Sequence, residues 1–148
     1  DAICMESFLV SDGSYAYEEL SLHPAYPFRM TARDMARFGL LFLQNGVWDG
    51  KQIISEDWIR ESTTSYSDAG MAGGYGYMWW VAVDGKLLPG LDLENGAYTA
   101  SGYNGHFILI IPNYDLVIVH RVNTDINNKV SNIQFAMLVG MILDARTI

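Results

Sequence analysis

The segment from Phe107 to Val119 constrains the fold most, because it predicts two adjacent strands. Two apolar runs, Phe107–Ile111 and Leu116–Val119, flank a Pro-Asn-Tyr-Asp turn. Proline presets the φ angle of a turn residue, and Asn and Asp tolerate tight bends. Short β-branched runs on either side of such a turn are typical of an antiparallel hairpin. Neither run alternates apolar with polar residues, so we expect other elements to cover both faces of this hairpin.

A Gly-rich segment with the sequence ASGYNG leads into the hairpin from Ala100. Glycines at the edge of a strand let a ligand approach the backbone closely. We therefore take Ser101, Gly102, Tyr103 and Asn104 as candidate ligand-binding residues. The alternative is that Ser101 and Gly102 only begin a strand, and that Tyr103 and Asn104 only form a turn.

Two helices are expected in the first half of the chain. Thr31 fits an N-cap, and apolar residues at helical spacing follow it, which predicts a helix from about residue 32 to residue 44. Ser55 fits the N-cap of a second, short helix, with Trp58 and Ile59 on its buried side. Asp34 falls in the first turn of the longer helix, where a carboxylate favours the helix N-terminus, so we interpret it as structural.

The second half predicts strands and then a closing helix. The segment Tyr75–Val83 is aromatic and β-branched, which predicts a strand whose Tyr75 and Tyr77 are core residues or cross-strand pairs rather than the lining of a cleft. Apolar residues recur at helical spacing from Val130 to Met141, and further apolar residues fill the other faces. This pattern is typical of a helix that is buried on more than one side.

The order of these elements indicates an α+β fold, with an antiparallel sheet packed against helices. We expect a single partial domain over residues 1–148, with loops and helices in 1–66 and antiparallel strands plus the closing helix in 67–148. The chain offers little material to cover the second face of the sheet. We therefore expect exposed apolar surface and a homodimer that buries it.

The composition limits the partners and the chemistry of this chain. A formal net charge of −8 and a pI of about 4.6 disfavour nucleic acid as a partner, and no apolar run is long enough to predict a transmembrane helix. The single cysteine, Cys4, cannot form an internal disulfide. His23, His106 and His120 match no metal-ligand spacing, so we expect no metal site. The chain begins at Asp1 without an initiator Met, which favours an excerpt or an upstream segment that was removed.

Three segments, His23–Ser55, Gly73–Val81 and Ala100–Arg121, together resemble serine β-lactamase-like hydrolases. This group includes class C β-lactamases, penicillin-binding proteins and related esterases and amidases. The resemblance implies the C-terminal part of the β-lactamase/transpeptidase-like fold, with a sheet and helices beside a mostly helical region. It also implies acyl transfer through a nucleophilic serine on a small-molecule substrate, without a cofactor. Members of the group are often exported, and the sequence itself leaves the compartment open.

Two of the three motifs of that group are absent from this sequence. No Ser stands three residues before Lys51, Lys86 or Lys129, so Ser-x-x-Lys is missing, and no Tyr has Asn two positions later. The best match to the third motif, Lys-Thr-Gly, is Ala100-Ser101-Gly102, because the alternative placement over residues 97–99 is poorer. In the family, the lysine of this motif binds a carboxylate of the substrate and relays protons. Its replacement by Ala100 puts both roles in doubt and argues against a β-lactam specialist.

The resemblance assigns a role to each candidate residue of the third motif. The backbone N–H of Tyr103 would be one of the two oxyanion donors, Gly102 would let the substrate lie against the strand, and Ser101 would donate a side-chain hydrogen bond. The catalytic nucleophile and its base are not in the chain. We therefore expect a fragment of a serine hydrolase that is inactive alone. The alternative is a stand-alone, non-catalytic binding or dimerisation module with the same half-fold.

Overall fold

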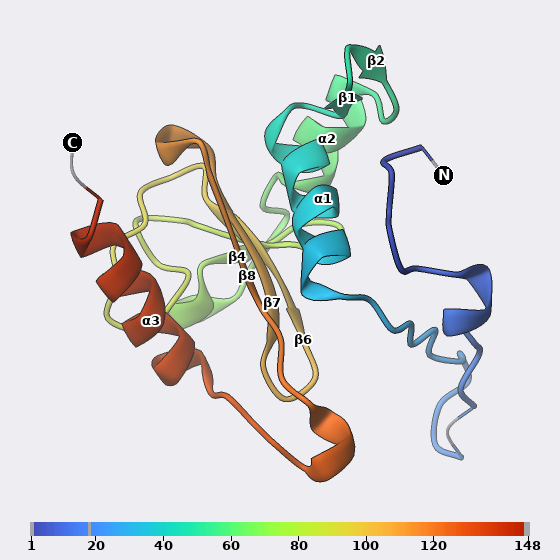
Figure 1. Cartoon of the computed structure of the whole chain (residues 1–148). Helices are drawn as coiled ribbons and strands as arrows, with labels where there is room; N and C mark the ends of the chain where they lie inside the picture. The colour runs from blue at the N-terminus through green and yellow to red at the C-terminus, as the bar shows by residue number, and fades with distance from the viewer. Residues whose placement is uncertain (1, 18, 147–148) are drawn as a thin grey trace.

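The computed structural model describes residues 2–17 and 19–146 and arranges them as helices on both sides of one antiparallel sheet (Figure 1). The helices are α1 (Ala32–Leu43), α2 (Glu56–Ser62) and α3 (Asn132–Asp144). Two short strands, β1 (Val47–Trp48) and β2 (Lys51–Gln52), pair with each other. The main sheet contains β3 (Ser67–Asp68), β4 (Gly74–Tyr75), β5 (Trp80–Val81), β6 (Tyr98–Gly102), β7 (His106–Ile111) and β8 (Leu116–His120).

The six strands of the main sheet follow one another in chain order, and each pairs antiparallel with the next. The longest ladders join β6 to β7 and β7 to β8, with Gly102 opposite His106 and Phe107 opposite His120. A 3-10 turn that begins at Pro112 links β7 to β8, and Asp115 takes the left-handed conformation at its end. The predicted hairpin is therefore confirmed, and β8 forms one edge of the sheet.

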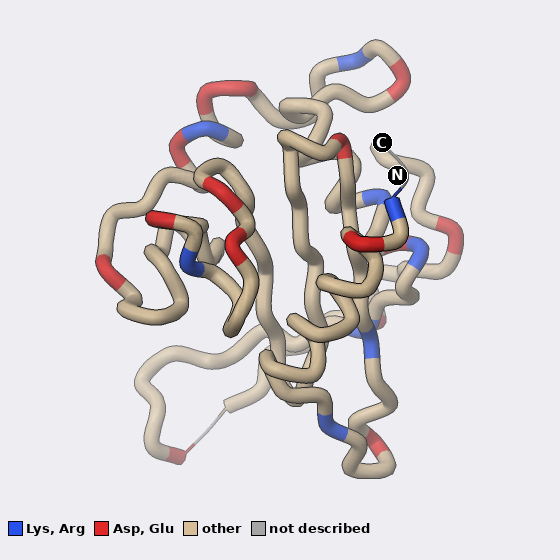
Figure 2. The backbone as a smooth tube through the Cα atoms, turned by 90° about the vertical axis from the view of Figure 1, so that its left-hand side faces the viewer, with Lys and Arg blue, Asp and Glu red and all other residues tan. Residues whose placement is uncertain are grey.

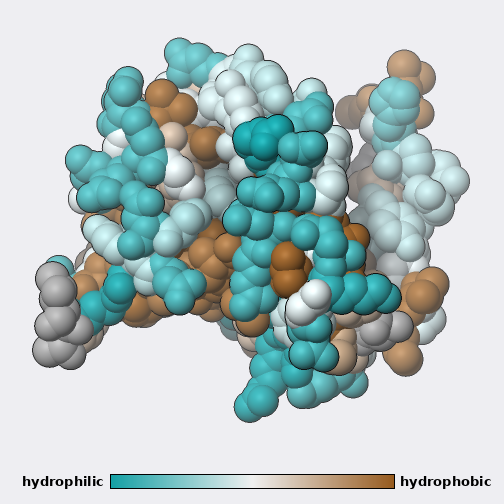
Figure 3. Space-filling model, turned by 90° about the horizontal axis from the view of Figure 1, so that it is seen from above, coloured by the Kyte–Doolittle hydropathy of each residue, from teal (hydrophilic) through white to brown (hydrophobic). Residues whose placement is uncertain are grey.

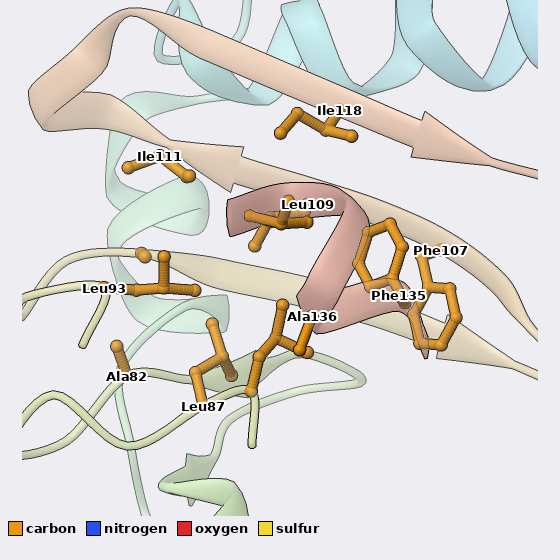
Figure 4. Packing of buried hydrophobic residues seen from close by; sticks show 12 residues of the cluster. Ala82, Leu87, Leu93, Phe107, Leu109, Ile111, Ile118, Phe135 and Ala136 are labelled. Carbon is orange, nitrogen blue, oxygen red and sulfur yellow. The ribbon is translucent and has the colours of Figure 1, made fainter. Parts of the chain in front are cut away.

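Alternate residues of β7 belong to two different hydrophobic clusters, one on each face of the sheet. Phe107, Leu109 and Ile111 pack with Phe135 of α3 in the first cluster (Figure 4). Ile108 and Ile110 pack in the second cluster, which includes residues of α1. The expectation of cover on both faces is confirmed for β7, whose last five residues are buried. It holds only partly for β8, where Ile118 is buried and its neighbours are half-buried.

Helix α1 lies directly on β7 and β8 because one of its residues has no side chain. A Cβ atom at Gly39 would lie 2.6 Å from Val117 Cγ1 and 2.9 Å from Ile108 Cγ2. The predicted N-cap is also present, since the hydroxyl of Thr31 accepts a hydrogen bond from the backbone N–H of Asp34. The contact between α1 and the strands β7 and β8 joins the first part of the chain to the sheet. The division of the chain into residues 1–66 and 67–148 stays a prediction.

Two expectations for the aromatic segments are wrong. The segment 75–83 is not one strand, because Met78 adopts a φ of 68° and turns the chain between β4 and β5. Trp58 is not on the buried side of α2, since it is 46% exposed and stacks on Tyr77, although Ile59 is buried as expected. Stacking between surface aromatic rings removes apolar area from water without placing either ring in the core.

The closing helix α3 is buried on one side only, in contrast to the expectation from its composition. Its N-terminus is capped, since Ser131 and Gln134 form a capping box. Phe135 and Val139 point into the core, but Ile133, Met137 and Met141 are 61%, 66% and 70% exposed. These three residues, which we call the α3 stripe, recur every four positions on one face. In Figure 3, apolar atoms reach the surface on the side of the molecule where α3 lies.

Candidate substrate site

A cleft with a volume of about 670 Å³ lies between the N-terminal segment, α1 and the ends of strands β6 to β8. Parts of the chain that are far apart in sequence form its walls. The residues that line it are Pro27–Met30, Met35, Phe38, Tyr75, Met78–Trp80, Ala100–Tyr103, His106, Ile108, Arg121 and Asn123–Asp125. A concave, mostly apolar site with a few polar groups is the usual form of a small-molecule site.

One wall of the cleft is an open strand edge. The ladder between β5 and β6 ends at Thr99, whereas the ladder between β6 and β7 continues to Gly102. After Thr99, the edge of β6 that faces β5 is therefore unpaired, whereas its other edge still pairs with β7. Ser101 and Gly102 are exposed there, and Tyr103 is 79% exposed. A backbone edge of this kind can donate N–H groups to a ligand, as oxyanion binding requires.

The structure brings three of the four predicted site residues to the cleft. Ser101, Gly102 and Tyr103 line it, and a Cβ atom at Gly102 would lie 3.3 Å from that of His106, which is a tight contact. Asn104 does not line the cleft. It takes a φ of 56°, and its carbonyl oxygen accepts a hydrogen bond of 3.0 Å from the N–H of Val130. The roles of all four in substrate binding stay predictions.

Packed aromatic rings form the apolar floor of the cleft. Trp79 is 4% exposed and lies 4.7 Å from the ring centre of Phe42 and 5.1 Å from that of Tyr98. Burial raises the pKa of the Tyr98 phenol, so this group stays neutral at physiological pH. Such packing fixes the position of Trp79 and gives the cleft a rigid surface for an apolar ligand.

Tyr75 and Tyr77, which the sequence placed in the core or in cross-strand pairs, differ in outcome, because Tyr75 is the cross-strand partner of Trp80. Tyr75 is half-buried, lines the cleft and makes an edge contact of 4.9 Å with Trp80. Tyr77 is 45% exposed and stacks on Tyr66 at 5.0 Å. The core interpretation is therefore wrong for Tyr77. It fails because the turn at Met78 divides the supposed strand and changes the direction in which the side chains point.

The rim of the cleft carries charged residues that sequence reasoning missed. Arg29 forms an ion pair of 3.0 Å with Asp125, and both side chains are largely exposed. Arg121 and His106 lie at the ends of neighbouring strands. Burial lowers the pKa of His106, and the charges of Arg121 and His120 lower it further, so its imidazole is mostly neutral at pH 7. Register is the signal that could have found Arg121, because it follows His120, the partner of Phe107.

Neither a metal centre nor a membrane-spanning helix is found in the described part of the chain. Residues 2–17 and 19–146 contain no group of three or more His, Cys, Asp or Glu side chains that could hold a metal ion. The nitrogen Nδ1 of His120 instead makes a hydrogen bond of 2.8 Å with the carbonyl of Gly105. Within the same residues, every helix is too short or too polar to cross a lipid bilayer.

Comparison with known proteins identifies the family. A family model described as beta-lactamase matches residues 9–138, which is most of the chain. The chain belongs to the β-lactamase family. The resemblance and the α+β fold expected from the sequence are thereby confirmed, and the family is one of β-lactamase-like serine hydrolases.

The chain is also similar to three known proteins. It is 30% identical over 99 residues to a 6-aminohexanoate-dimer hydrolase of Paenarthrobacter ureafaciens, covering 60% of this chain and 23% of that protein. It is 28% identical over 104 residues to an uncharacterized protein of Alkalihalophilus pseudofirmus, covering 64% and 30%. A solved structure of a putative 6-aminohexanoate-dimer hydrolase from Bacillus anthracis matches with a TM-score of 0.56 and 28% identity, covering 88% and 32%. The chain thus spans about a third or less of these relatives.

Proposed function

We propose that this chain supplies one wall of the substrate site of a β-lactamase-like serine hydrolase, whose nucleophilic serine lies outside the chain. The observation that carries the proposal is the open edge of β6 beside a cleft of about 670 Å³. In this arrangement the N–H of Tyr103 serves as one oxyanion donor, and Gly102 lets the substrate lie against the strand. Without Ser-x-x-Lys the chain alone lacks the nucleophile and its base, so it binds substrate without turnover.

The substrate class that we favour is a small acyl compound joined through an amide or ester bond. Ala100 replaces the lysine that the family's third motif carries, which argues against a β-lactam specialist. Two of the relatives are named 6-aminohexanoate-dimer hydrolases, one of them putatively, so that dimer is the first compound to test. Export of the parent protein stays an expectation from the family.

Fluorescence of Trp79 and Trp80, which line the cleft, offers a direct test. We expect saturable quenching when the 6-aminohexanoate dimer is titrated to about 10 mM, a range that detects weak complexes. The variant G102V places a branched side chain in the cleft and should abolish the response. The control is G140A, since Gly140 lies outside the cleft, has no positive φ and would bring a Cβ atom only into an ordinary contact of 3.4 Å with Leu91 Cδ2. Both variants require a check of folding by circular dichroism.

Three results would contradict this proposal. A flat response of the native chain over the whole titration would remove the binding function. Release of 6-aminohexanoate by the chain alone would refute the location of the nucleophile outside it. Equal binding by G102V and the native chain would show that the ligand lies elsewhere.

The second candidate function is a non-catalytic dimerisation module. The exposed α3 stripe favours it, because large apolar patches on a surface usually mark an interface. The oligomeric state separates the two candidates only in part, since a fragment with an uncovered face also associates.

A further inference from the structure

The charge of the cleft differs in sign from the charge of the whole chain. The sequence has 9 Lys and Arg against 17 Asp and Glu. Acidic positions lie on loops and helices in many parts of the molecule, whereas the central strands are free of charged residues (Figure 2). Among the described residues that line the cleft, however, two are arginines and one is a carboxylate. A concave site with such a lining concentrates anions relative to the rest of the surface.

One of the two arginines is already neutralised. The guanidinium of Arg29 meets the carboxylate of Asp125 through both of its terminal nitrogens, at 3.0 Å and 3.4 Å. The ion pairs of residues 2–17 and 19–146 involve Arg29, Arg37 and Arg60 but not Arg121. Arg121 therefore contributes the net positive charge of the cleft.

Strand register places Arg121 on the same face of the sheet as the floor of the cleft. Val119 is opposite Ile108, and both belong to the cluster beneath α1. Side chains alternate between faces along a strand, so Arg121, two residues after Val119, continues that row. One step beyond the last pair of this ladder, Phe107 with His120, Arg121 comes beside His106, which is opposite Gly102, and both residues line the cleft. Two strand spacings, roughly 10 Å, then separate the backbone of Arg121 from the open edge of β6.

The neighbouring groups leave Arg121 able to bind an anion. His106 is mostly neutral, because burial and the charge of Arg121 lower its pKa, and a neutral ring does not compete for a carboxylate. Ala100, at the position of the lysine in the family's third motif, supplies no cation from β6. A guanidinium forms two parallel hydrogen bonds with a carboxylate, which is a stronger contact than a neutral pair.

We propose that Arg121 binds a carboxylate on the substrate, so that the site takes acyl compounds with an anionic end and an apolar middle. The anionic end lies at the rim, the methylene groups cross the floor formed by Trp79, and the acyl carbon meets the edge at Gly102 and Tyr103. This inference deepens the proposed function and rests on it. It identifies Arg121 as the specificity-determining residue.

The test compares hexanoate with its neutral analogue hexanamide in the same fluorescence titration. We expect the native chain to bind hexanoate about 10-fold or more tightly than hexanamide, as a hydrogen-bonded charge pair provides. The variant R121Q should lose that preference and still bind hexanamide, which also shows that it is folded. The control R60Q removes the same charge from an exposed pair with Asp57 on α2 and should change neither affinity.

Salt provides a second measurement that requires no variant. Hexanoate binding to the native chain should weaken as sodium chloride rises, while hexanamide binding stays constant. Equal affinities for the two ligands, or an equal loss in R60Q and R121Q, would overturn the role of Arg121 and leave the binding cleft intact. Binding of neither ligand would overturn the proposed function together with this inference.

Discussion

Asp34 shows how one buried carboxylate holds two parts of this chain together. Its side chain is fully buried and accepts hydrogen bonds from the backbone N–H groups of Glu6 and Ser7 at 2.9 Å and 3.2 Å. It also accepts a hydrogen bond from the hydroxyl of Thr31 and contacts Arg37 at 3.2 Å. Burial by itself raises the pKa of this carboxyl, but these hydrogen bonds and the charge of Arg37 lower it below the ordinary value.

This balance predicts a dependence of stability on pH. Because the pKa of Asp34 is lower in the folded than in the unfolded chain, its contribution is complete above the unfolded value of about 4. It is lost as pH falls through the folded value. We expect D34N to lower the urea midpoint at pH 7, and the gap between native chain and variant to close below pH 4.

The exposed Asp57 provides the matched control for this experiment, since its side chain is 82% exposed in its pair with Arg60. The variant D57N should give nearly the native midpoint at every pH. A gap between the native chain and D34N that stays constant from pH 7 to about pH 3 would refute the ionised contact.

Single residues could be predicted from the sequence where the reason was local. Thr31 and Ser55 are N-caps as expected, because a hydroxyl followed by helical spacing is a local signal. The contacts of Asp34 with Glu6 and Ser7 join residues 27 or more positions apart, and no local pattern indicates them. The register of β7 and β8 places Arg121 at the end of that ladder, but its place in the cleft depends on the packing of the N-terminal segment and α1.

The contact between α1 and the sheet yields a prediction about two glycines. Replacing a helical Gly with Ala normally stabilises a helix by about 1 kcal/mol. At Gly39 the new methyl group meets Val117 and Ile108 at under 3.0 Å, and overpacking of a core costs about 1–3 kcal/mol. We therefore expect G39A to lower or leave unchanged the free energy of unfolding in urea.

Gly140 in α3 is the control, because a Cβ atom there would lie 3.4 Å from Leu91 Cδ2, an ordinary contact. G140A should raise the free energy of unfolding by about 0.5–1 kcal/mol. Equal stabilisation by both variants would show that α1 can move away from β7 and β8 without loss.

Whole elements could be predicted where the hydrophobic periodicity was strong. The prediction failed where the chain changes direction within an apolar segment. The helix over 32–44 and the hairpin around Pro112 match α1 and β7–β8 closely. The segment 75–83 has the composition of a strand, yet a positive φ at Met78 divides it, and Met gives no signal for such a turn. Composition also failed for α3, because an apolar helix need not be covered by the residues of its own chain.

At the scale of the molecule, the sequence indicated the sheet but was wrong about an uncovered sheet face, because α1 and α3 cover its two sides and the exposed apolar residues lie on the outer side of α3. The strands of the sheet follow one another in chain order, so each ladder joins two strands that are neighbours in sequence. Apolar runs separated by turn residues predict such pairs. The cleft was not readable in this way. Its walls come from the N-terminal segment, α1, the β4–β5 turn and the loop after β8, which only the packed chain brings together.

The α3 stripe yields the last prediction, which concerns the assembly. Ile133, Met137 and Met141 present an exposed apolar face on the outer side of α3. We expect the isolated chain to sediment as a dimer that buries this face. The double variant M137K/M141K places charges in the interface and should raise the dissociation constant by about 10-fold or more, because an unpaired buried charge is costly. The control M71K changes an exposed Met outside α3, and this variant should remain dimeric. A clean monomer at high concentration would refute the dimer.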